Sequence, residues 1–522
     1  MNTTSSRSRR AALALAAATV AGLALPATAA SAATSATSAP EGRDPGDAVA
    51  VPARYSHQIL DWQPCDGQPA LECATMAVPR DWTDPDSGLA DLSIAVSRHK
   101  ATDAAGRKGT LMLGAGGPGA QNGLVRPAGL VKAAPKVAAV YDIVGLDQRG
   151  VGRSTHVVCE TQEEWQGFLA GDYRDRSPEA IAKVIDNSRK FAESCQRNSG
   201  DLLPYINTVQ TAHDVDLFRG LLGERKLSYL GPSYASMIGA YYGTLFPHRV
   251  DHLILDSNIG WESTWERFEL GQPMSFQRRF DEDFVPWLAA RDATYHWGST
   301  PEEVTAHWER VRAGLHDKPI VDGSLTIGPN QLDNGAIGTV YLASNFPSFA
   351  QALTALDDWQ AAGPDAKDLA HKAFGHYLGP EFTAEYFSVT CSDTPWNRDL
   401  DTWVERSAEL TARYPLVGPR TLAFSAVCAA WPTDPAPRVK VTGAHLPPTL
   451  MLNSVHDPAT YYEAAVGAHR ALRGSRLVTV TGSGDHGQYP TANTCVTDVV
   501  ERYLLDDRAP EHDLTCPTPQ AG

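Results

Sequence analysis

Three residues that lie far apart in the sequence have the side chains needed to cleave an acyl bond: Ser233, Asp457 and His486. A serine hydroxyl is a weak nucleophile until a histidine removes its proton, and a carboxylate must orient that histidine. The order serine, aspartate, histidine, with each residue just after a strand, is typical of one class of hydrolases. The sequence therefore predicts a nucleophile, an orienting acid and a base at these positions.

The segment around Ser233 reads KLSYLGPSYA, from Lys226 to Ala235. An apolar run predicts a strand before the serine, and the residues after it predict an immediate helix. Small residues two places before and after the serine, Gly231 and Ala235, allow the strand and the helix to approach closely. The familiar pattern has a second glycine where this chain has Ala235, so we expect the same sharp turn with one additional methyl group.

The proposed acid and base also follow predicted strands. The separation of 29 positions from Asp457 to His486 accommodates one helix and one further strand. Taken singly, Asp457 could cap that helix and His486 could be a surface loop residue, whereas their common position after strands favours catalysis. Asp256, which follows an earlier predicted strand, is the alternative acid.

The tetrahedral intermediate of acyl transfer needs hydrogen-bond donors for its oxyanion. The segment LMLGAGGPGAQNG follows another predicted strand, and its glycines leave main-chain N–H groups accessible. We assign the two donors to Gly117 and to Tyr234, the residue after the nucleophile. The alternative, a phosphate-binding loop, lacks the P-loop lysine, and Pro118 removes one donor.

These side chains require a sheet whose strands end at a common edge. Short apolar segments, often β-branched, predict strands over residues 92–98, 110–115, 140–147, 226–231, 252–257, 448–453 and 476–482. Between two of them, residues 208–224 have helical periodicity and stop at Gly223. This alternation predicts an α/β fold with a mostly parallel central sheet covered on both faces.

The region from 260 to 440 interrupts the strand series and holds nine of the 12 tryptophans. Helical signals recur in it, such as the run Thr300-Pro301-Glu302-Glu303, which supplies an N-cap, a first-turn proline and a capping glutamate. We predict a largely helical cap over the ends of the sheet, inserted between core segments 56–259 and 441–522. Tryptophans could line a substrate groove there, but packing within the cap is the expected role of most.

The first 55 residues precede the predicted core. Three arginines, an apolar stretch from Ala11 to Leu25 and the sequence Ala30-Ser31-Ala32 are typical of a signal peptide, here residues 1–32. The apolar stretch has 15 residues, short of the ~20 that span a bilayer, which disfavours a retained anchor. Residues 33–55 predict a prosegment or flexible linker. We therefore expect a secreted protein with no membrane contact after signal removal.

All eight cysteines lie beyond residue 32. An even number in an oxidising compartment predicts disulfides, and pairing of neighbours is the simplest connectivity. The expected pairs are Cys65–Cys73, Cys159–Cys195, Cys391–Cys428 and Cys495–Cys516. The sequence has no spacing typical of a zinc site, so we expect neither a metal nor another cofactor.

The formal net charge is −16 and becomes −19 when residues 1–32, with their three arginines and no acid, are removed. A strongly acidic protein is a poor partner for nucleic acid and attracts cationic ligands. The same charge would also keep an exported protein soluble. We expect no binding of nucleic acid.

Seven segments carry a wider likeness: GAGGPGAQNG, YDIVGLDQRGVGRST, LSYLGPSYASMIGAYYGTLFPHRV, CSDTPW, CAAWP, HDPATYYEAA and GSGDHGQY. Together, and colinearly from Asp61 to Cys516, the chain resembles secreted bacterial tripeptidyl aminopeptidases, serine peptidases of the α/β-hydrolase superfamily related to proline iminopeptidases. The resemblance implies an α/β-hydrolase fold and implies that Ser233, Asp457 and His486 act as nucleophile, acid and base. It further implies secretion and release of tripeptides from free N-termini.

The chain departs from that family at three places. Ala235-Ser236 stands where Gly-Thr is usual, residues 119–122 read GAQN where GGSG is frequent, and Thr390 stands where an acid often precedes a cysteine. An extended tripeptide places its ammonium about 10 Å from the scissile carbonyl, so an exopeptidase needs a carboxylate there. Asp393 is our candidate, and its alternative role is to form a turn beside a disulfide.

We expect a secreted, cofactor-independent serine aminopeptidase that releases tripeptides or dipeptides from peptides with free N-termini. The same triad also serves esterases and amidases that act on non-peptide substrates, which is the first alternative. The second is a binding protein without activity, which the presence of all three triad residues disfavours. Epoxide hydrolases and dehalogenases use an aspartate nucleophile where this chain has Ser233.

Overall fold

The computed structural model describes residues 51–375 and 378–518. The predicted signal peptide and residues 33–50 of the predicted linker lie outside the described residues. The last residues of that linker belong to the folded domain, because helix α1 (Ala53–Ser56) contains the buried Tyr55, whose hydroxyl donates to Asp91 at 2.6 Å. The folded domain therefore begins slightly before residue 56.

A ten-stranded sheet forms the centre of the domain, in the order β1-β2-β3-β5-β4-β6-β7-β10-β11-β12. Its strands are β1 (Gln63–Cys65), β2 (Gln68–Val78), β3 (Leu92–His99), β4 (Gly109–Leu113), β5 (Tyr141–Leu146), β6 (Leu227–Ser233), β7 (Val250–Asn258), β10 (Thr449–Ser454), β11 (Ser475–Thr481) and β12 (Leu514–Pro517). Strands β1 to β3 are antiparallel to their neighbours, and the strands from β5 onward in this order are parallel. Strands β1, β2 and β12 are additional to the seven that the sequence predicted.

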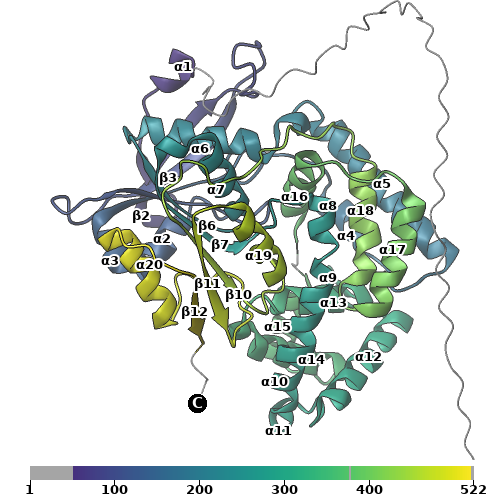
Figure 1. The fold of residues 1–522 in the computed structure, drawn as a ribbon. Helices are drawn as coiled ribbons and strands as arrows, with labels where there is room; N and C mark the ends of the chain where they lie inside the picture. Colours follow the sequence, from purple (N-terminus) through teal and green to yellow (C-terminus); the bar gives the residue numbers. More distant parts are fainter. Residues whose placement is uncertain (1–50, 376–377, 519–522) are drawn as a thin grey trace, which may run out of the picture. The chain divides into compact units, whose positions relative to one another are not determined.

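Helices cover both faces of this sheet. They are α2 (Arg126–Ala133), α3 (Pro135–Val140), α6 (Thr208–Leu221), α7 (Tyr234–Leu245), α19 (Tyr462–Ala471) and α20 (Thr494–Asp506). Alternate side chains of β4 show the division: Leu111 and Leu113 belong to the apolar core that includes residues of α2, α3 and α20, whereas Met112 belongs to the core that includes residues of α6, α7 and α19. Figure 1 shows these helices around the sheet. Side chains of successive residues in a strand point to opposite faces, so each apolar strand contributes to two cores.

A largely helical segment lies between β7 and β10, where the sequence predicts a cap over residues 260–440, and we call this segment the cap. Its elements are α8 (Trp265–Glu269), α9 (Gln272–Arg279), α10 (Val285–Ala289), α11 (Asp292–Tyr295), α12 (Pro301–Asp317), a hairpin of β8 (Ile320–Asp322) and β9 (Leu325–Ile327), α13 (Pro329–Thr339), α14 (Phe346–Asp357), α15 (Pro364–Gly375), α16 (Pro380–Asp393), α17 (Leu400–Arg413) and α18 (Thr421–Ala429). The cap has an apolar core of its own, which includes Phe284, Trp308 and Phe349. Helix α12 begins as predicted, because the Thr300 side chain accepts a hydrogen bond from the N–H of Glu303. 

A second inserted segment, between β5 and β6, also contributes to the cap. It comprises α4 (Gln162–Phe168) and α5 (Pro178–Ser199), and α5 packs along α18. The Ser188 hydroxyl donates to the Ala423 carbonyl at 2.9 Å, and the rings of Phe191 and Phe387 lie 5.3 Å apart. These helices lie within residues 56–259, which the sequence analysis assigned to the core. Strand and helix patterns do not reveal which neighbour a helix packs against.

Four disulfides join the neighbouring cysteines: Cys65–Cys73, Cys159–Cys195, Cys391–Cys428 and Cys495–Cys516. Cys391–Cys428 links α16 to α18 and so ties together two helices of the cap. Disulfides of this number are typical of proteins that fold in an oxidising compartment. No helix within the described ranges is both long and apolar enough to cross a membrane.

Candidate active site

Ser233 occupies a sharp turn between β6 and α7. Its backbone has φ 59° and ψ −132°, a conformation that non-glycine residues rarely adopt. Gly231 is required two places earlier, because a Cβ there would lie 2.5 Å from the Tyr229 ring. The methyl group of Ala235 is accommodated by Gly114 of the next strand end, where a Cβ would lie only 2.6 Å from that methyl. The turn with alanine therefore forms because the neighbouring strand ends in glycine.

Asp457 and His486 are hydrogen-bonded to each other at the ends of β10 and β11. The Nδ1 of His486 lies 2.9 Å and 3.1 Å from the two carboxylate oxygens of Asp457. Asp457 is fully buried and also accepts the N–H groups of Ala459 at 3.0 Å and Thr460 at 2.9 Å. This carboxylate can hold the proton of the imidazole on Nδ1, which leaves Nε2 free to accept another proton.

The charge state of His486 follows from its surroundings. Burial lowers the pKa of His486, but the charge of Asp457, its hydrogen bond and the charge of Asp256 outweigh burial, so the pKa lies above the ordinary value. Asp256 does not contact the imidazole. Its carboxylate accepts the N–H groups of Gln488 at 2.7 Å and Tyr489 at 3.0 Å, and so shapes the loop after His486.

The cap holds the loop that carries His486. The N–H of His486 donates to the Tyr341 carbonyl at 2.8 Å, and the two rings meet edge to face with centroids 5.2 Å apart. Asp485 pairs with Arg279 of α9 at 2.7 Å and accepts the N–H of Ala343 at 2.8 Å. The proposed base therefore depends on both the core and the cap for its position.

Ser233 and His486 line one cavity of about 400 Å³ between the core and the cap. We call its two sides the core wall, which includes Gly116, Gly117, Arg126, Ser233, His486 and Tyr489, and the cap wall, which includes Trp265, Phe268, Glu269, Tyr341, Tyr386 and Phe424. The cap wall is mainly aromatic, and its charged residues are Glu269 and Arg420. Cavities of roughly 300–1,000 Å³ with a few placed polar groups are typical ligand sites.

The glycine-rich loop after β4 reaches Ser233. A Cβ on Gly116 would lie 3.1 Å from the Cβ of Ser233, and Gly117 has φ 106° and lines the cavity. The side-chain amide of Gln148 donates to the Ala115 carbonyl at 2.7 Å and holds this loop from below. The N–H of Tyr234 belongs to the first turn of α7, where N–H groups have no acceptor within the helix.

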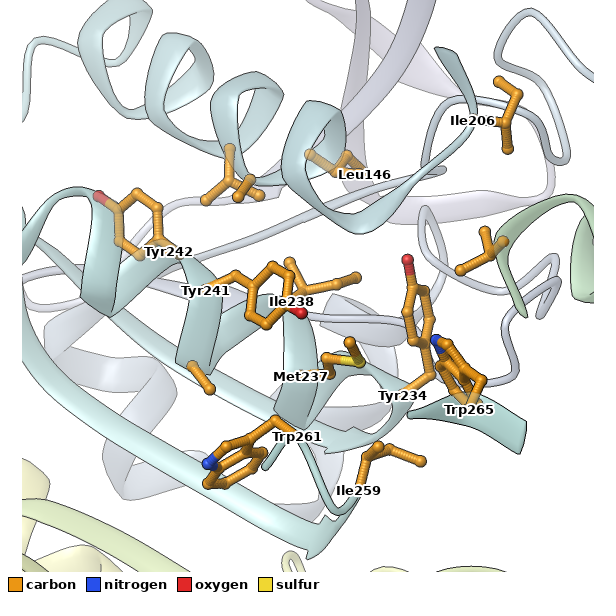
Figure 2. Close-up of a cluster of buried hydrophobic side chains, with 14 of the residues drawn as sticks. Leu146, Ile206, Tyr234, Met237, Ile238, Tyr241, Tyr242, Ile259, Trp261 and Trp265 are labelled. Atoms are coloured by element: carbon orange, nitrogen blue, oxygen red, sulfur yellow. The ribbon is translucent and has the colours of Figure 1, made fainter. Parts of the chain in front are cut away.

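Asp393 is not among the residues that line the cavity. It is 3% exposed, and burial raises its pKa to about 6. Its carboxylate accepts the Thr208 hydroxyl at 2.5 Å and the indole N–H of Trp265 at 3.1 Å, and Thr208 in turn lies 2.9 Å from the Tyr234 hydroxyl. Figure 2 shows the side chains of Tyr234 and Trp265 next to each other. Asp393 thus supports residues of the site and offers no surface to a ligand.

Glu269 is the acidic residue that lines the cavity, and the sequence reasoning did not find it. Its carboxylate accepts the Tyr386 hydroxyl at 2.5 Å. Burial raises the pKa of Glu269, while the Tyr386 hydrogen bond and the charge of Arg420 oppose that rise. The available signal was the spacing of Trp265, Phe268 and Glu269, which places a carboxylate on an otherwise aromatic helix face.

The arrangement is suited to nucleophilic acyl transfer, and comparisons with known proteins agree. A family described as TAP-like protein matches residues 414–516. The chain is 34% identical over 491 residues to a tripeptidyl aminopeptidase of Streptomyces lividans, covering 90% of this chain and 89% of that protein.

Two mycobacterial proteins are also similar. The serine protease Hip1 of Mycobacterium tuberculosis is 28% identical over 485 residues, covering 88% of this chain and 91% of that protein. A protein of the same organism named carboxylesterase B is 28% identical over 499 residues, covering 91% of this chain and 92% of that protein. The identity to the Streptomyces enzyme extends over nine-tenths of the chain, and the chain therefore belongs to the tripeptidyl aminopeptidase family of serine hydrolases.

Proposed function

We propose that this protein is a secreted aminopeptidase that releases tripeptides from the free N-termini of peptides. Ser233 is the nucleophile, His486 the base, Asp457 the acid that orients the base, and Gly117 and Tyr234 the oxyanion donors. The bond between Asp457 and His486, and the presence of Ser233 in the same cavity as His486, support these roles. Family membership supports the reaction, and the predicted signal peptide and the four disulfides support secretion.

The observation that carries the substrate assignment is Glu269. A carboxylate in a cavity with aromatic walls is costly unless a cation or a hydrogen-bond donor compensates it. Tyr386 supplies one donor and Arg420 a positive charge that acts on Glu269, and an α-ammonium would add a second positive charge and further donors. Glu269, in place of the predicted Asp393, is therefore our candidate for the group that binds the substrate amine.

The reaction follows from the positions of these groups. As the Ser233 Oγ attacks the scissile carbonyl, His486 Nε2 accepts its proton, and the N–H groups of Gly117 and Tyr234 bind the oxyanion. His486 then gives that proton to the departing amine, and the C–N bond breaks. Water attacks the acyl-enzyme with the same histidine as base, which restores the Ser233 hydroxyl and releases the tripeptide.

Four substrates test this proposal: a free-amine tripeptide chromogenic amide, its N-acetylated twin, the matching single-residue amide and a short-chain ester. We expect the wild type to cleave the free tripeptide and to discriminate against the other amides. Ser233→Ala should lower kcat roughly 10⁶-fold. Glu269→Gln should reduce the preference for the free tripeptide over its acetylated twin by about 100-fold, since a charge-assisted pair is lost.

Glu266→Gln is the matched control. Glu266 lies on the same short helix α8, does not line the cavity, and accepts the N–H of Asn397 at 2.7 Å, which a glutamine can still do. This variant should keep the preference for the free amine. Equal cleavage of the free and acetylated tripeptides by the wild type would contradict an aminopeptidase.

An esterase is the second candidate. The aromatic cap wall favours an apolar acyl or alcohol group, and one relative carries the name carboxylesterase B. Strong ester turnover that is indifferent to a free amine would favour this candidate and would keep the same nucleophile and base.

A further inference from the structure

Two residues of the core wall each have a buried polar atom that lacks a hydrogen-bond partner. In the described part of the chain, buried side-chain nitrogen or oxygen atoms without a hydrogen-bond partner occur on eleven residues. Only two of these residues line the catalytic cavity: Arg126, through Nε, and Tyr489, through its hydroxyl. Buried polar groups in proteins are almost always hydrogen-bonded, so two exceptions in one ligand site point to a ligand.

Both groups are donors. A guanidinium has only N–H donors and stays charged in proteins, although burial lowers the pKa of Arg126. Burial raises the pKa of Tyr489, so its hydroxyl keeps its proton. No carboxylate of the described residues forms an ion pair with Arg126. A cation and a neutral donor on one wall match a carboxylate, which accepts several hydrogen bonds and removes the cost of an unpaired charge.

The position of these donors indicates which part of a peptide they meet. Tyr489 follows His486 by three residues, and Asp256 holds the main chain of Tyr489 while its charge acts on Arg126. His486 must reach the departing amine to protonate it, so the leaving part of the substrate lies on the His486 side of Ser233. The acyl part extends toward Glu269 on the opposite, cap wall.

We propose that Arg126 and Tyr489 bind a carboxylate of the leaving group, next to the scissile bond. This inference rests on the proposed aminopeptidase activity and extends it to the other side of the bond. The carboxylate is either the C-terminal one, when a single amino acid leaves, or an Asp or Glu side chain at the start of a longer leaving peptide. Glu269 for the ammonium and Arg126 for the carboxylate would orient a short zwitterionic peptide, and Arg420, whose charge acts on Glu269, is a further cation of the cap side.

The test compares substrates that differ only in this carboxylate. Tetra-alanine is paired with its C-terminal amide, and a hexapeptide amide with Asp at the fourth position is paired with its Asn twin. We expect the wild type to favour the acid of at least one pair by about 10-fold or more in kcat/KM, as for a hydrogen-bonded charge. Preference in the first pair alone identifies the C-terminal carboxylate, and preference in the second pair alone identifies the side chain.

Substitutions then locate the preference. Arg126→Gln should bring the acid-to-amide ratio to about one, Arg126→Lys should retain part of it because the charge remains, and Tyr489→Phe should lower it a few-fold. The matched control is Lys132→Gln, which removes an exposed cation from the same helix α2 and should leave the ratio unchanged. Each ratio is internal to one variant, so a general loss of activity does not alter it.

Two results would overturn the inference. One is a wild type that cleaves acid and amide equally in both pairs. The other is a preference for the acid that survives in Arg126→Gln. A wild type that cleaves none of these peptides but hydrolyses the short-chain ester would overturn the proposed function as well, and that outcome is distinct from cleavage without preference.

Discussion

The two walls of the catalytic cavity hold their functional groups by different means. On the core wall, main-chain geometry fixes the chemistry: Ser233 has φ 59° between β6 and α7, and Asp457 accepts two main-chain N–H groups besides the imidazole. On the cap wall, side chains of separate helices meet, as Tyr386 of α16 does with Glu269 of α8. We infer that strand ends set the reaction and that cap helices select the substrate.

Substitutions on the two walls should therefore affect different kinetic constants. Ser233 and His486 of the core wall act on atoms whose charge changes during the reaction, so their loss should lower kcat, whereas loss of Arg126 or Tyr489 should change the substrate preference. Groups of the cap wall contact a part of the substrate that does not react, so their loss should mainly raise KM or change preference. The following variants test that division.

The largest effect is expected for Asp457→Asn. An asparagine keeps the geometry but cannot stabilise the imidazolium, and it favours the wrong tautomer, so kcat should fall about 10⁴-fold with little change in KM. The matched control is Asp256→Asn, because Asp256 accepts main-chain N–H groups and does not contact His486. Steady-state kinetics on the free tripeptide amide measure kcat for both variants. A larger fall in kcat for Asp256→Asn than for Asp457→Asn would show that Asp256 is the acid that orients His486.

A smaller effect is expected for Tyr386→Phe on the cap wall. This variant removes the 2.5 Å hydrogen bond to Glu269 and leaves the carboxylate less well placed for an ammonium. A hydrogen bond to a charged group contributes about 1.5–3 kcal/mol, which corresponds to a rise in KM of roughly 10- to 100-fold. Steady-state kinetics with the free tripeptide amide measure this rise in KM. A fall in kcat of that size with an unchanged KM would break the proposed division between the walls.

The smallest effect is a displacement of the pH profile. The pKa of His486 lies above its ordinary value, and only the neutral imidazole can accept the serine proton, so activity should fall as the pH drops through a value above about 6.5. The short-chain ester is the right substrate, since it has no ammonium for Glu269. The residual activity of Asp457→Asn should lose its acid limb at lower pH than the wild type, because the charge and hydrogen bond of Asp457 raise the pKa. An acid limb at the same pH in Asp457→Asn and in the wild type would show that a group other than His486 controls the fall in activity.

The sequence predicted the core wall well because carboxyl ends of parallel strands gather at one edge of a sheet. Ser233 is the last residue of β6, and Asp457 and His486 follow β10 and β11 by a few residues, so their meeting needs only the order and direction of the strands. The helical nature of the cap was also predictable from capping residues such as Thr300. The short edge strands β1 and β12 were missed because they combine few residues with exposed positions. The longer β2, with 11 residues, was missed as well, and its first three residues are partly or fully exposed.

The cap wall could not be predicted in the same way. Asp393 and Glu269 are both cap carboxylates, and only the packing of α16 on α8 and on Thr208 decides that Asp393 is enclosed while Glu269 faces the cavity. Such contacts between helices are not encoded in the periodicity of either helix. The inserted segment with α4 and α5 illustrates the same point, because it lies in the core segment of the sequence and in the cap of the molecule.

The attachment to the cap of the loop that carries His486 limits how this enzyme can be recombined with its relatives. The cap contributes the Tyr341 carbonyl, the Ala343 N–H and Arg279, and the core contributes His486 and Asp485, which these groups hold. A chimaera that takes its cap from one parent and its C-terminal segment from another would divide these partners. Crossover points that keep residues 279, 341, 343 and 485 from a single parent should yield active hybrids. New specificity in this enzyme should therefore be sought in changes inside the cap that leave these three anchors in place.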